Sequence, residues 1–91
     1  MKITFHGTRG YIEAKNRRHR RHSVFQVSYK GSSLMIDWGE DWLGRGSLLE
    51  GVSALFITHG HPDHAWGLAD GCPCPVHATA PTLELLEKYP L

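Results

Sequence analysis

The chain has 91 residues, of which 41% are hydrophobic and 21% are charged, and its formal net charge is +1. This length allows one small domain, and the near-neutral charge excludes a strongly acidic or basic protein. The chain has no apolar run long enough for a membrane span, and its first residues lack the apolar core of a signal peptide. We therefore expect a cytoplasmic protein without a membrane partner.

The first half of the chain predicts three strands. Residues 2–6 form the first predicted strand, which ends at Gly7. Residues 23–30 alternate between apolar and polar side chains. Such alternation is typical of half-buried strands. A turn at residues 30–33 leads to an apolar strand over residues 34–38. The last two strands are therefore expected to form a hairpin.

A basic segment lies between the first two predicted strands. Residues 15–22 hold five of the chain's ten Lys and Arg residues. Guanidinium groups bind phosphate through paired hydrogen bonds, so this loop could hold a phosphodiester or a nucleic-acid backbone. The candidate substrate-binding residues are Arg17, Arg18, Arg20 and Arg21. The alternative is a solvated basic loop without a ligand.

The second half of the chain predicts short strands and helices in alternation. Apolar runs bounded by Gly and Pro mark each element. The predicted elements are a helical turn at 48–50, a buried strand at 54–58, a short helix at 63–69, a strand at 76–78 and a closing helix capped by Thr79 and ended by Pro90. This order predicts an α/β domain in which helices cover one face of a mixed sheet.

The densest group of metal ligands directly follows the strand at 54–58. It is the run His59-Gly60-His61-Pro62-Asp63-His64. Imidazole and carboxylate are the ligands that catalytic zinc sites prefer. Residues two apart in extended chain point the same way, so His59 and His61 can reach one ion together. Pro62 suits the first turn of a helix, which would place Asp63 and His64 beside a second ion. A structural or adventitious histidine site is the alternative.

The two cysteines form the run Cys72-Pro73-Cys74. A disulfide across a single residue is strained, so we expect reduced thiols or simple turn residues. A metal-binding role together with His77 is the alternative, although a lone Cys-x-Cys pair is a weak signal.

The His-x-His-x-Asp-His run at residues 59–64 resembles the signature of the metallo-β-lactamase-fold hydrolases. Residues 34–39 are similar to the strand of that family that ends in Asp-x-Gly, and residues 5–10 to its first strand and Gly-rich turn. Residues 75–79 resemble its strand after the metal-loop helix. The order of a Gly-Thr turn, a basic loop and a strand that opens at Ser23 is similar to the phosphodiesterase and tRNA 3′-end-processing branches.

The resemblance implies that residues 1–91 form one partial domain, the N-terminal half of an αββα sandwich. The family completes its metal sites with His, Asp and His residues further downstream, whereas His77 is the only histidine after His64 in this chain. A piece of a longer enzyme and a genuine short form both remain open. We expect self-association or a missing C-terminal half, because the inner sheet face would be apolar. The residues predicted for this face are Val24, Val27, Leu34, Ile36, Leu55 and Ile57.

The resemblance also implies metal-assisted hydrolysis of a small-molecule ester or a phosphodiester. One or two Zn²⁺ ions, or alternatively Mn²⁺ or Fe²⁺, would be held by His59, His61, Asp63 and His64 and would activate water. Asp63 would be catalytic, since it would orient this water and accept its proton. Asp37 would support the metal loop, where such partners fix the orientation of the ligands. The alternatives are a non-catalytic metal-binding fragment and a nucleic-acid binder with a structural metal.

Overall fold

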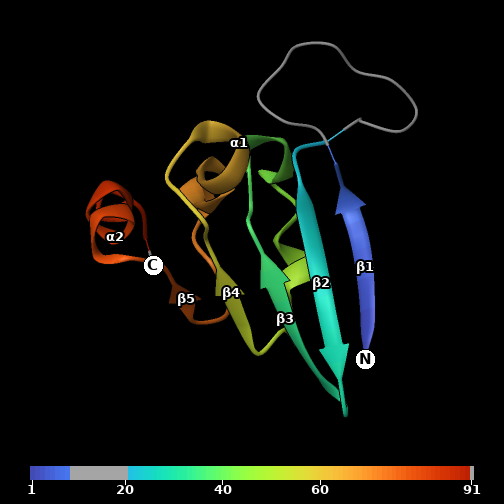
Figure 1. Ribbon diagram of the computed structural model, residues 1–91. Coiled ribbons are helices and arrows are strands. Elements are labelled where there is room, and N and C mark those ends of the chain that lie inside the picture. The colour runs from blue at the N-terminus through green and yellow to red at the C-terminus, as the bar shows by residue number, and fades with distance from the viewer. Residues whose placement is uncertain (9–20, 91) are drawn as a thin grey trace.

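In the computed structural model, which describes residues 1–8 and 21–90, five strands form one mixed sheet in the order β1-β2-β3-β4-β5 (Figure 1). The strands are β1 (Lys2–Gly7), β2 (Val24–Tyr29), β3 (Ser32–Ile36), β4 (Ala54–Phe56) and β5 (Val76–His77). Strands β1, β2 and β3 pair in antiparallel fashion, and β3, β4 and β5 pair in parallel. This arrangement confirms the predicted mixed sheet.

The hairpin between β2 and β3 closes through a two-residue loop. Lys30 and Gly31 have φ angles of +48° and +81°. Positive φ at both loop positions is the geometry that matches the twist of two antiparallel strands. The turn predicted at residues 30–33 is therefore too long, because Ser32 and Ser33 already pair with Tyr29 and Ser28.

Strand β3 ends earlier than predicted. The prediction extended it to Trp38, but the last strand residue is Ile36. Asp37 has a φ of +67°, which lies in the left-handed region and interrupts the extended backbone. This turn directs the chain after β3 away from the sheet and toward the helical layer.

The helical elements are short, and two of them replace the single helix predicted at 63–69. They are the 3₁₀ helices η1 (Glu40–Trp42), η2 (Gly46–Leu49) and η3 (Trp66–Asp70) and the α-helices α1 (Pro62–Ala65) and α2 (Ala80–Leu86). Within the described ranges, none of these helices is long and apolar enough to cross a membrane. Helix α1 gives way to η3 where the backbone N–H of Gly67 donates to the carbonyl of Trp38, 2.9 Å away. A tertiary hydrogen bond thus replaces a helical one.

Helix α2 begins where the sequence indicates and ends sooner. Thr79 is at its N-cap position, but its side chain makes no capping bond to the helix backbone. Its hydroxyl instead donates to Oγ1 of Thr82 at 3.1 Å. The helix ends at Leu86, before Pro90.

One face of the sheet, which we call the covered face, packs against the helical layer. Met35 and Leu55 are adjacent on β3 and β4 and are fully buried there. Around them lies the hydrophobic core, which comprises Val24, Met35, Trp38, Trp42, Leu49, Val52, Leu55, Ile57, Ala65, Leu68 and Leu86. In residues 1–8 and 21–90, the helices therefore cover one face only, as predicted.

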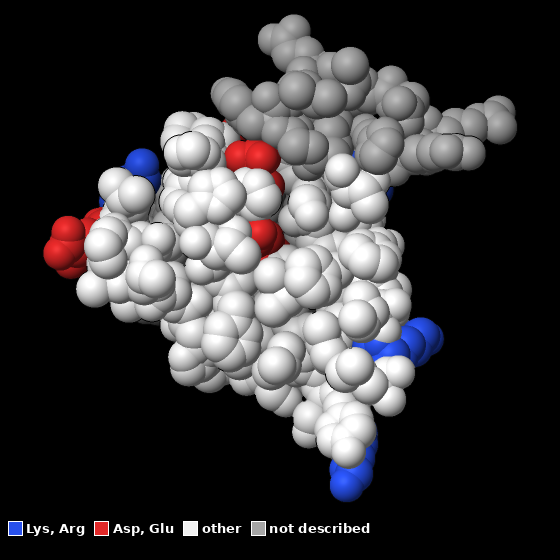
Figure 2. Space-filling view, in the orientation of Figure 1, with Lys and Arg blue, Asp and Glu red and all other residues white. Residues whose placement is uncertain are grey.

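The opposite face, which we call the open face, carries a row of exposed apolar side chains. Phe5 is 68% exposed and Phe56 is 38% exposed, although large apolar side chains are normally buried. The strand register aligns the following residues on this face: Ile3, Phe5, Phe25, Val27, Leu34, Ile36 and Phe56. Figure 2 shows the molecule from this side, where uncharged residues cover most of the surface.

The composition predicted for this face is half right. Val27, Leu34 and Ile36 lie on the open face, as expected. Val24, Leu55 and Ile57 belong to the buried core instead. Phe25 and Phe56, which follow Val24 and Leu55 in the sequence, lie on the open face instead, because side chains alternate between the two faces along each strand.

Candidate metal centre

The predicted metal ligands lie at one edge of the sheet, beyond the ends of β3 and β4. These two strands run in parallel, so their carboxyl ends meet at the same edge. The backbone N–H of Asp37, just after β3, donates to the carbonyl of Phe56 at the end of β4, 2.8 Å away. This bond ties the two strand ends together, and the chain after β4 then enters the metal loop.

Asp37 joins that loop to helix α1. Its side chain is buried, and its Oδ1 accepts hydrogen bonds from the backbone N–H of Thr58 at 2.7 Å and the Thr58 hydroxyl at 3.0 Å. Its Oδ2 lies 2.6 Å from Nδ1 of His64. A carboxylate only accepts, so Nδ1 of His64 is assigned the proton. This hydrogen bond fixes the orientation of the imidazole ring and leaves Nε2 facing away from Asp37.

Three of the four predicted ligands converge. The ligand atoms of His59, Asp63 and His64 all lie within 4.8 Å of one another. Nε2 of His64 is 2.9 Å from Oδ2 of Asp63, and the rings of His59 and His64 have centroids 4.1 Å apart. Asp63 is buried in the first turn of α1. One loop and one short helix thus present two imidazoles and a carboxylate to a common point.

His61 lies beside this group. Its ring is exposed and stands edge-on to that of His59, with centroids 4.7 Å apart. The sequence assigns His59 and His61 to one ion and Asp63 and His64 to another, whereas the structure brings His59 closest to the second pair. The division of the ligands between two ions remains a prediction.

The contact between His64 and Asp63 tests whether a cation suits this group. Because Asp37 binds Nδ1, the ring nitrogen of His64 that is left for a metal ion is Nε2, which lies 2.9 Å from Oδ2 of Asp63. Imidazole nitrogen and carboxylate oxygen are both suitable ligands for one divalent cation, and these two atoms are close enough to share it. The residues therefore fit a metal ion.

Two glycines let α1 approach the loop after β3. A Cβ atom on Gly39 would lie 2.2 Å from the carbonyl oxygen of Asp63, and one on Gly67 would lie 2.5 Å from the carbonyl oxygen of Gly39. The backbone N–H of Trp38 donates to the carbonyl of His64 at 2.8 Å in the same interface. The ligand-bearing helix is therefore held by backbone contacts that any larger residue would disturb.

Helix α2 contacts the metal loop from its other side. A Cβ atom on Gly60, between the two loop histidines, would lie 2.7 Å from Cδ1 of Leu85. The loop is thus packed between α2 and the end of β3.

Sequence reasoning placed Thr58 near the metal loop but missed its bonds to the Asp37 side chain, and it missed the close packing at Gly67. Thr58 is the polar residue that directly precedes the histidine run, and this position was a usable signal for a partner of Asp37. Gly67 interrupts the predicted helix, and a glycine inside a helical pattern often marks close packing. Neither residue carries a ligand atom for the metal, but both help to hold those that do.

The basic segment is described only at its end. Arg17, Arg18 and Arg20 lie outside the described residues. The guanidinium of Arg21 is 5.6 Å from the ring centroid of Trp42, which is a cation–π arrangement. Next to it, the backbone N–H of His22 donates to Oδ2 of Asp41 at 3.0 Å, and that of Asp41 donates to Nδ1 of His22 at 3.2 Å. This end of the segment is therefore anchored to η1.

The family of the chain follows from comparison with known proteins. The profile of the metallo-beta-lactamase superfamily matches residues 18–73. This match covers more than half of the sequence, in the segment that contains the ligand group described above. The chain therefore belongs to the metallo-beta-lactamase superfamily, whose members use divalent metal ions, and the predicted fold class is confirmed.

Two curated proteins and one solved structure show which members of the superfamily the chain is similar to. The chain is 37% identical over 70 residues to ribonuclease Z of Methanopyrus kandleri, in an alignment that covers 72% of this chain and 24% of that protein. It is 33% identical over 72 residues to a UPF0173 metal-dependent hydrolase of a Chelativorans species, covering 70% and 24%. The crystal structure of human tRNase Z, short form, superimposes with a TM-score of 0.56 and 28% identity, covering 76% of this chain and 27% of that one. The chain thus spans 24% of the length of these two curated relatives.

Proposed function

We propose that this chain is the metal-binding portion of a metal-dependent hydrolase that cleaves phosphodiester bonds in nucleic acid. The observation that carries the proposal is the position of His64, whose Nδ1 is held by Asp37 while Nε2 faces the carboxylate of Asp63. The substrate class is supported by the relatives named ribonuclease Z and tRNase Z. Small-molecule esters remain the alternative substrates.

The proposed metal is Zn²⁺, as one ion or two, with His59, His61, Asp63 and His64 as ligands. When bound, it would supply Lewis acidity toward a phosphoryl oxygen and make water a stronger acid at neutral pH. The donor set supports this choice, since zinc accepts both imidazole nitrogen and carboxylate oxygen. Mn²⁺ and Fe²⁺ are alternatives for the same ligands.

The chain's own residues would have distinct roles in this reaction. Asp37 would keep Nδ1 of His64 protonated and its ring fixed, and Thr58 would hold Asp37 in place through two donated hydrogen bonds. Asp63 would orient the attacking water and accept its proton on a carboxylate oxygen. The burial of Asp63 supports this role, because a fixed base loses little freedom during the reaction.

The proposal extends to the basic segment. Arg17, Arg18, Arg20 and Arg21 would bind the phosphates of the nucleic acid. Their density supports this role, as does the anchoring of Arg21 next to the buried His22. Guanidinium groups bind phosphate oxygens in pairs and position the substrate without reading its sequence.

The open face would be covered by a second apolar surface. We propose that another copy of the chain, or a C-terminal half, packs against it. The exposed side chains of Ile3, Phe5 and Phe56 support this proposal, because burying them would be favourable at about 25 cal/mol per Å².

Zinc binding and hydrolysis can be tested with matched histidine variants. Zinc would be titrated calorimetrically into the wild type and into His64→Ala, and hydrolysis of bis(p-nitrophenyl) phosphate would be measured in the zinc-loaded proteins. We expect His64→Ala to lose both binding and turnover, because it removes a ligand. His77→Ala is the control, since His77 is an exposed histidine that stacks on Phe56, with ring centroids 5.0 Å apart, and does not belong to the ligand group.

The outcomes separate the candidate functions. Turnover that requires zinc and is lost in His64→Ala but kept in His77→Ala supports the hydrolase. Zinc binding without turnover overturns hydrolysis by this chain and favours the non-catalytic metal-binding fragment. Turnover that is unchanged in His64→Ala overturns the assignment of the centre.

Nucleic-acid binding is tested by its salt dependence. A single-stranded oligoribonucleotide would be titrated at several salt concentrations against the wild type and a variant with Arg17, Arg18, Arg20 and Arg21 replaced by Gln. Each lost phosphate contact lowers the slope of log affinity against log salt by about 0.7, so four contacts lower it by about 3. Arg45→Gln, which changes an exposed arginine outside the segment, is the control. An unchanged slope in the fourfold variant would exclude the segment as the contact.

A further inference from the structure

The loop between η3 and β5 brings two cysteine side chains close together. Cys72 and Cys74 are both reduced and half-buried, and their Sγ atoms are 3.5 Å apart. The chain has no other cysteine. Neither thiol belongs to the group formed by His59, Asp63 and His64.

This pair is held in place from both ends of its loop. The backbone N–H of Gly71 donates to the carbonyl of Leu68 at 2.8 Å, and the backbone N–H of Leu55 donates to the carbonyl of Pro75 at 2.9 Å. Pro73 and Pro75 restrict the backbone at every second position. Both cysteines also pack against the hydrophobic core. The two sulfurs are therefore brought together before any ligand binds.

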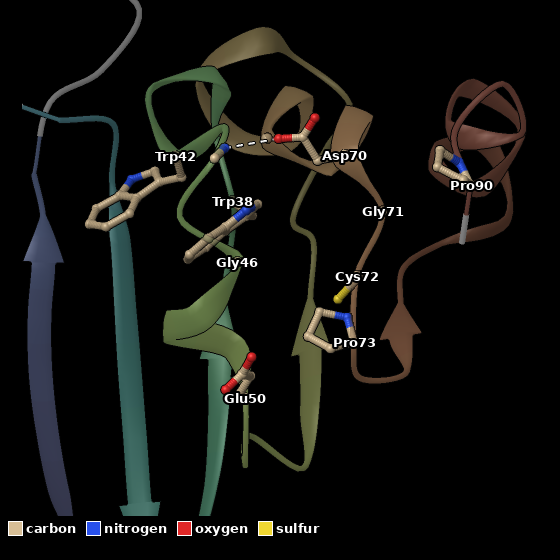
Figure 3. A pocket seen from close by; sticks show the side chains of 11 residues that line it. Trp38, Trp42, Gly46, Glu50, Asp70, Gly71, Cys72, Pro73 and Pro90 are labelled. Atoms are coloured by element: carbon tan, nitrogen blue, oxygen red, sulfur yellow. Dashed lines mark hydrogen bonds between the residues drawn. The ribbon is translucent and has the colours of Figure 1, made fainter.

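A cavity of about 430 Å³ gives access to one of the two thiols. Figure 3 shows this cavity, with Cys72 and Pro73 on one wall and Trp38 and Trp42 on another. Cys72 lines it, whereas Cys74 does not. None of the candidate ligands at residues 59–64 lines it. A small ion could therefore reach Cys72 without passing through the metal centre described above.

The distance between the sulfurs favours a shared ion over a disulfide. A disulfide requires the two sulfurs to approach to about 2.04 Å. Two sulfurs at about 2.3 Å from one tetrahedral ion lie roughly 3.8 Å apart, which is only a few tenths of an ångström from the observed spacing. Burial and the neighbouring Cys72 raise the pKa of the Cys74 thiol to about 12, so a bound ion would displace a proton from this sulfur.

We propose that Cys72 and Cys74 supply two thiolate ligands to a soft metal ion such as Cu(I), whose other positions face the cavity and are filled by small ligands from solution. Thiolates select soft ions, and Cu(I) is among those that they bind preferentially. Within the described part of the chain, no third His, Cys, Asp or Glu side chain completes a group with this pair. Two thiolates suit a soft ion that takes its remaining ligands from solution, and they do not suit a hard ion that needs six oxygen ligands.

The site can be tested with Cu(I) alone, supplied without oxygen to the full chain. The two readouts are the ultraviolet charge-transfer absorption between thiolate and Cu(I), and competition with a chromophoric Cu(I) chelator. Because the chain has only these two cysteines, every thiolate signal reports on this pair. We expect one ion per chain at the mass of the monomer in native mass spectrometry.

Substituting each cysteine in turn tests whether both thiolates bind the ion. Cys72→Ser and Cys74→Ser should each weaken Cu(I) affinity by at least about 10-fold, because each leaves a single thiolate without chelation. The two corresponding Ala variants, with folding checked by circular dichroism, separate this loss from damage to the loop. His59→Ala should bind Cu(I) as the wild type does, so failure of the zinc centre leaves this result unaffected.

Three results would overturn the proposal. One is the absence of charge-transfer absorption, and another is an affinity that either single substitution leaves unchanged. The third is one ion shared by two chains, which would show that the pair does not chelate within one loop.

Discussion

Met35 and Leu55 on the covered face are fully buried, whereas Phe5 and Phe56 on the open face of the same sheet are 68% and 38% exposed. On the covered side, the chain supplies its own partners: glycines at close backbone contacts, a buried core and a carboxylate whose two oxygens are both hydrogen-bonded. On the open side, the described residues supply no packing partner that buries Phe5 or Phe56. Since the candidate metal ligands are held from the covered side, their arrangement should not depend on what packs against the open face.

The largest expected effect comes from breaking the contact between α1 and the loop after β3. In Gly39→Ala, the new methyl group would lie 2.2 Å from the carbonyl oxygen of Asp63, so the backbone must shift. We expect the free energy of unfolding in urea to fall by about 3 kcal/mol. Gly46→Ala is the matched control, because nothing lies within 4 Å of its Cβ position and its φ is not positive. Equal stabilities of the two variants would contradict the close packing.

Asp37→Asn tests the support of the metal ligands at nearly constant volume. The substitution replaces the carboxylate that accepts from Nδ1 of His64 at 2.6 Å. Loss of such a partner costs about 10- to 100-fold in metal affinity, which calorimetric titration with zinc would show. Asp70→Asn, which changes an exposed carboxylate bonded to the backbone of Gly44, should leave the affinity unchanged. Unchanged affinity in Asp37→Asn would remove Asp37 from the centre.

The open face is tested by adding a charge to it. Phe5→Lys should weaken self-association about 10-fold in analytical ultracentrifugation, because burying the lysine charge in an apolar interface costs free energy. Zinc affinity should stay the same, as the comparison of the two faces requires. Leu43→Lys, at an apolar residue that is 40% exposed after η1, is the control. If Leu43→Lys weakened association as much as Phe5→Lys, the open face would not be the interface.

The smallest expected effect concerns alkaline stability. The pKa of Cys74 is raised from 9.0 to about 12 by burial and by Cys72. Between these values the folded chain keeps a proton that the unfolded chain loses, so this thiol favours the folded state less as pH rises from 9 toward 12. Urea midpoints should therefore fall less steeply above pH 9 in Cys74→Ser than in the wild type. Parallel curves would show that the thiol titrates alike in both states.

The sequence alone indicated the strands and the candidate metal ligands because both depend on local patterns. The run at 59–64 contains its ligands within six residues, so no tertiary information was needed to find it. The left-handed turn at Asp37 and the division of the helix at Trp66 depend on contacts between segments distant in sequence. The same limit explains the open face: alternation shows that Val24 and Phe25 point to opposite sides, but not which side the helices cover.

X-ray absorption at the zinc edge, on the wild-type chain loaded with one equivalent of Zn²⁺, tests the central claim most directly. The account predicts a first coordination sphere of nitrogen and oxygen with imidazole signatures, from His59, Asp63 and His64 or their neighbour His61. Zinc coordinated by sulfur, or no zinc retained after dialysis, would contradict it.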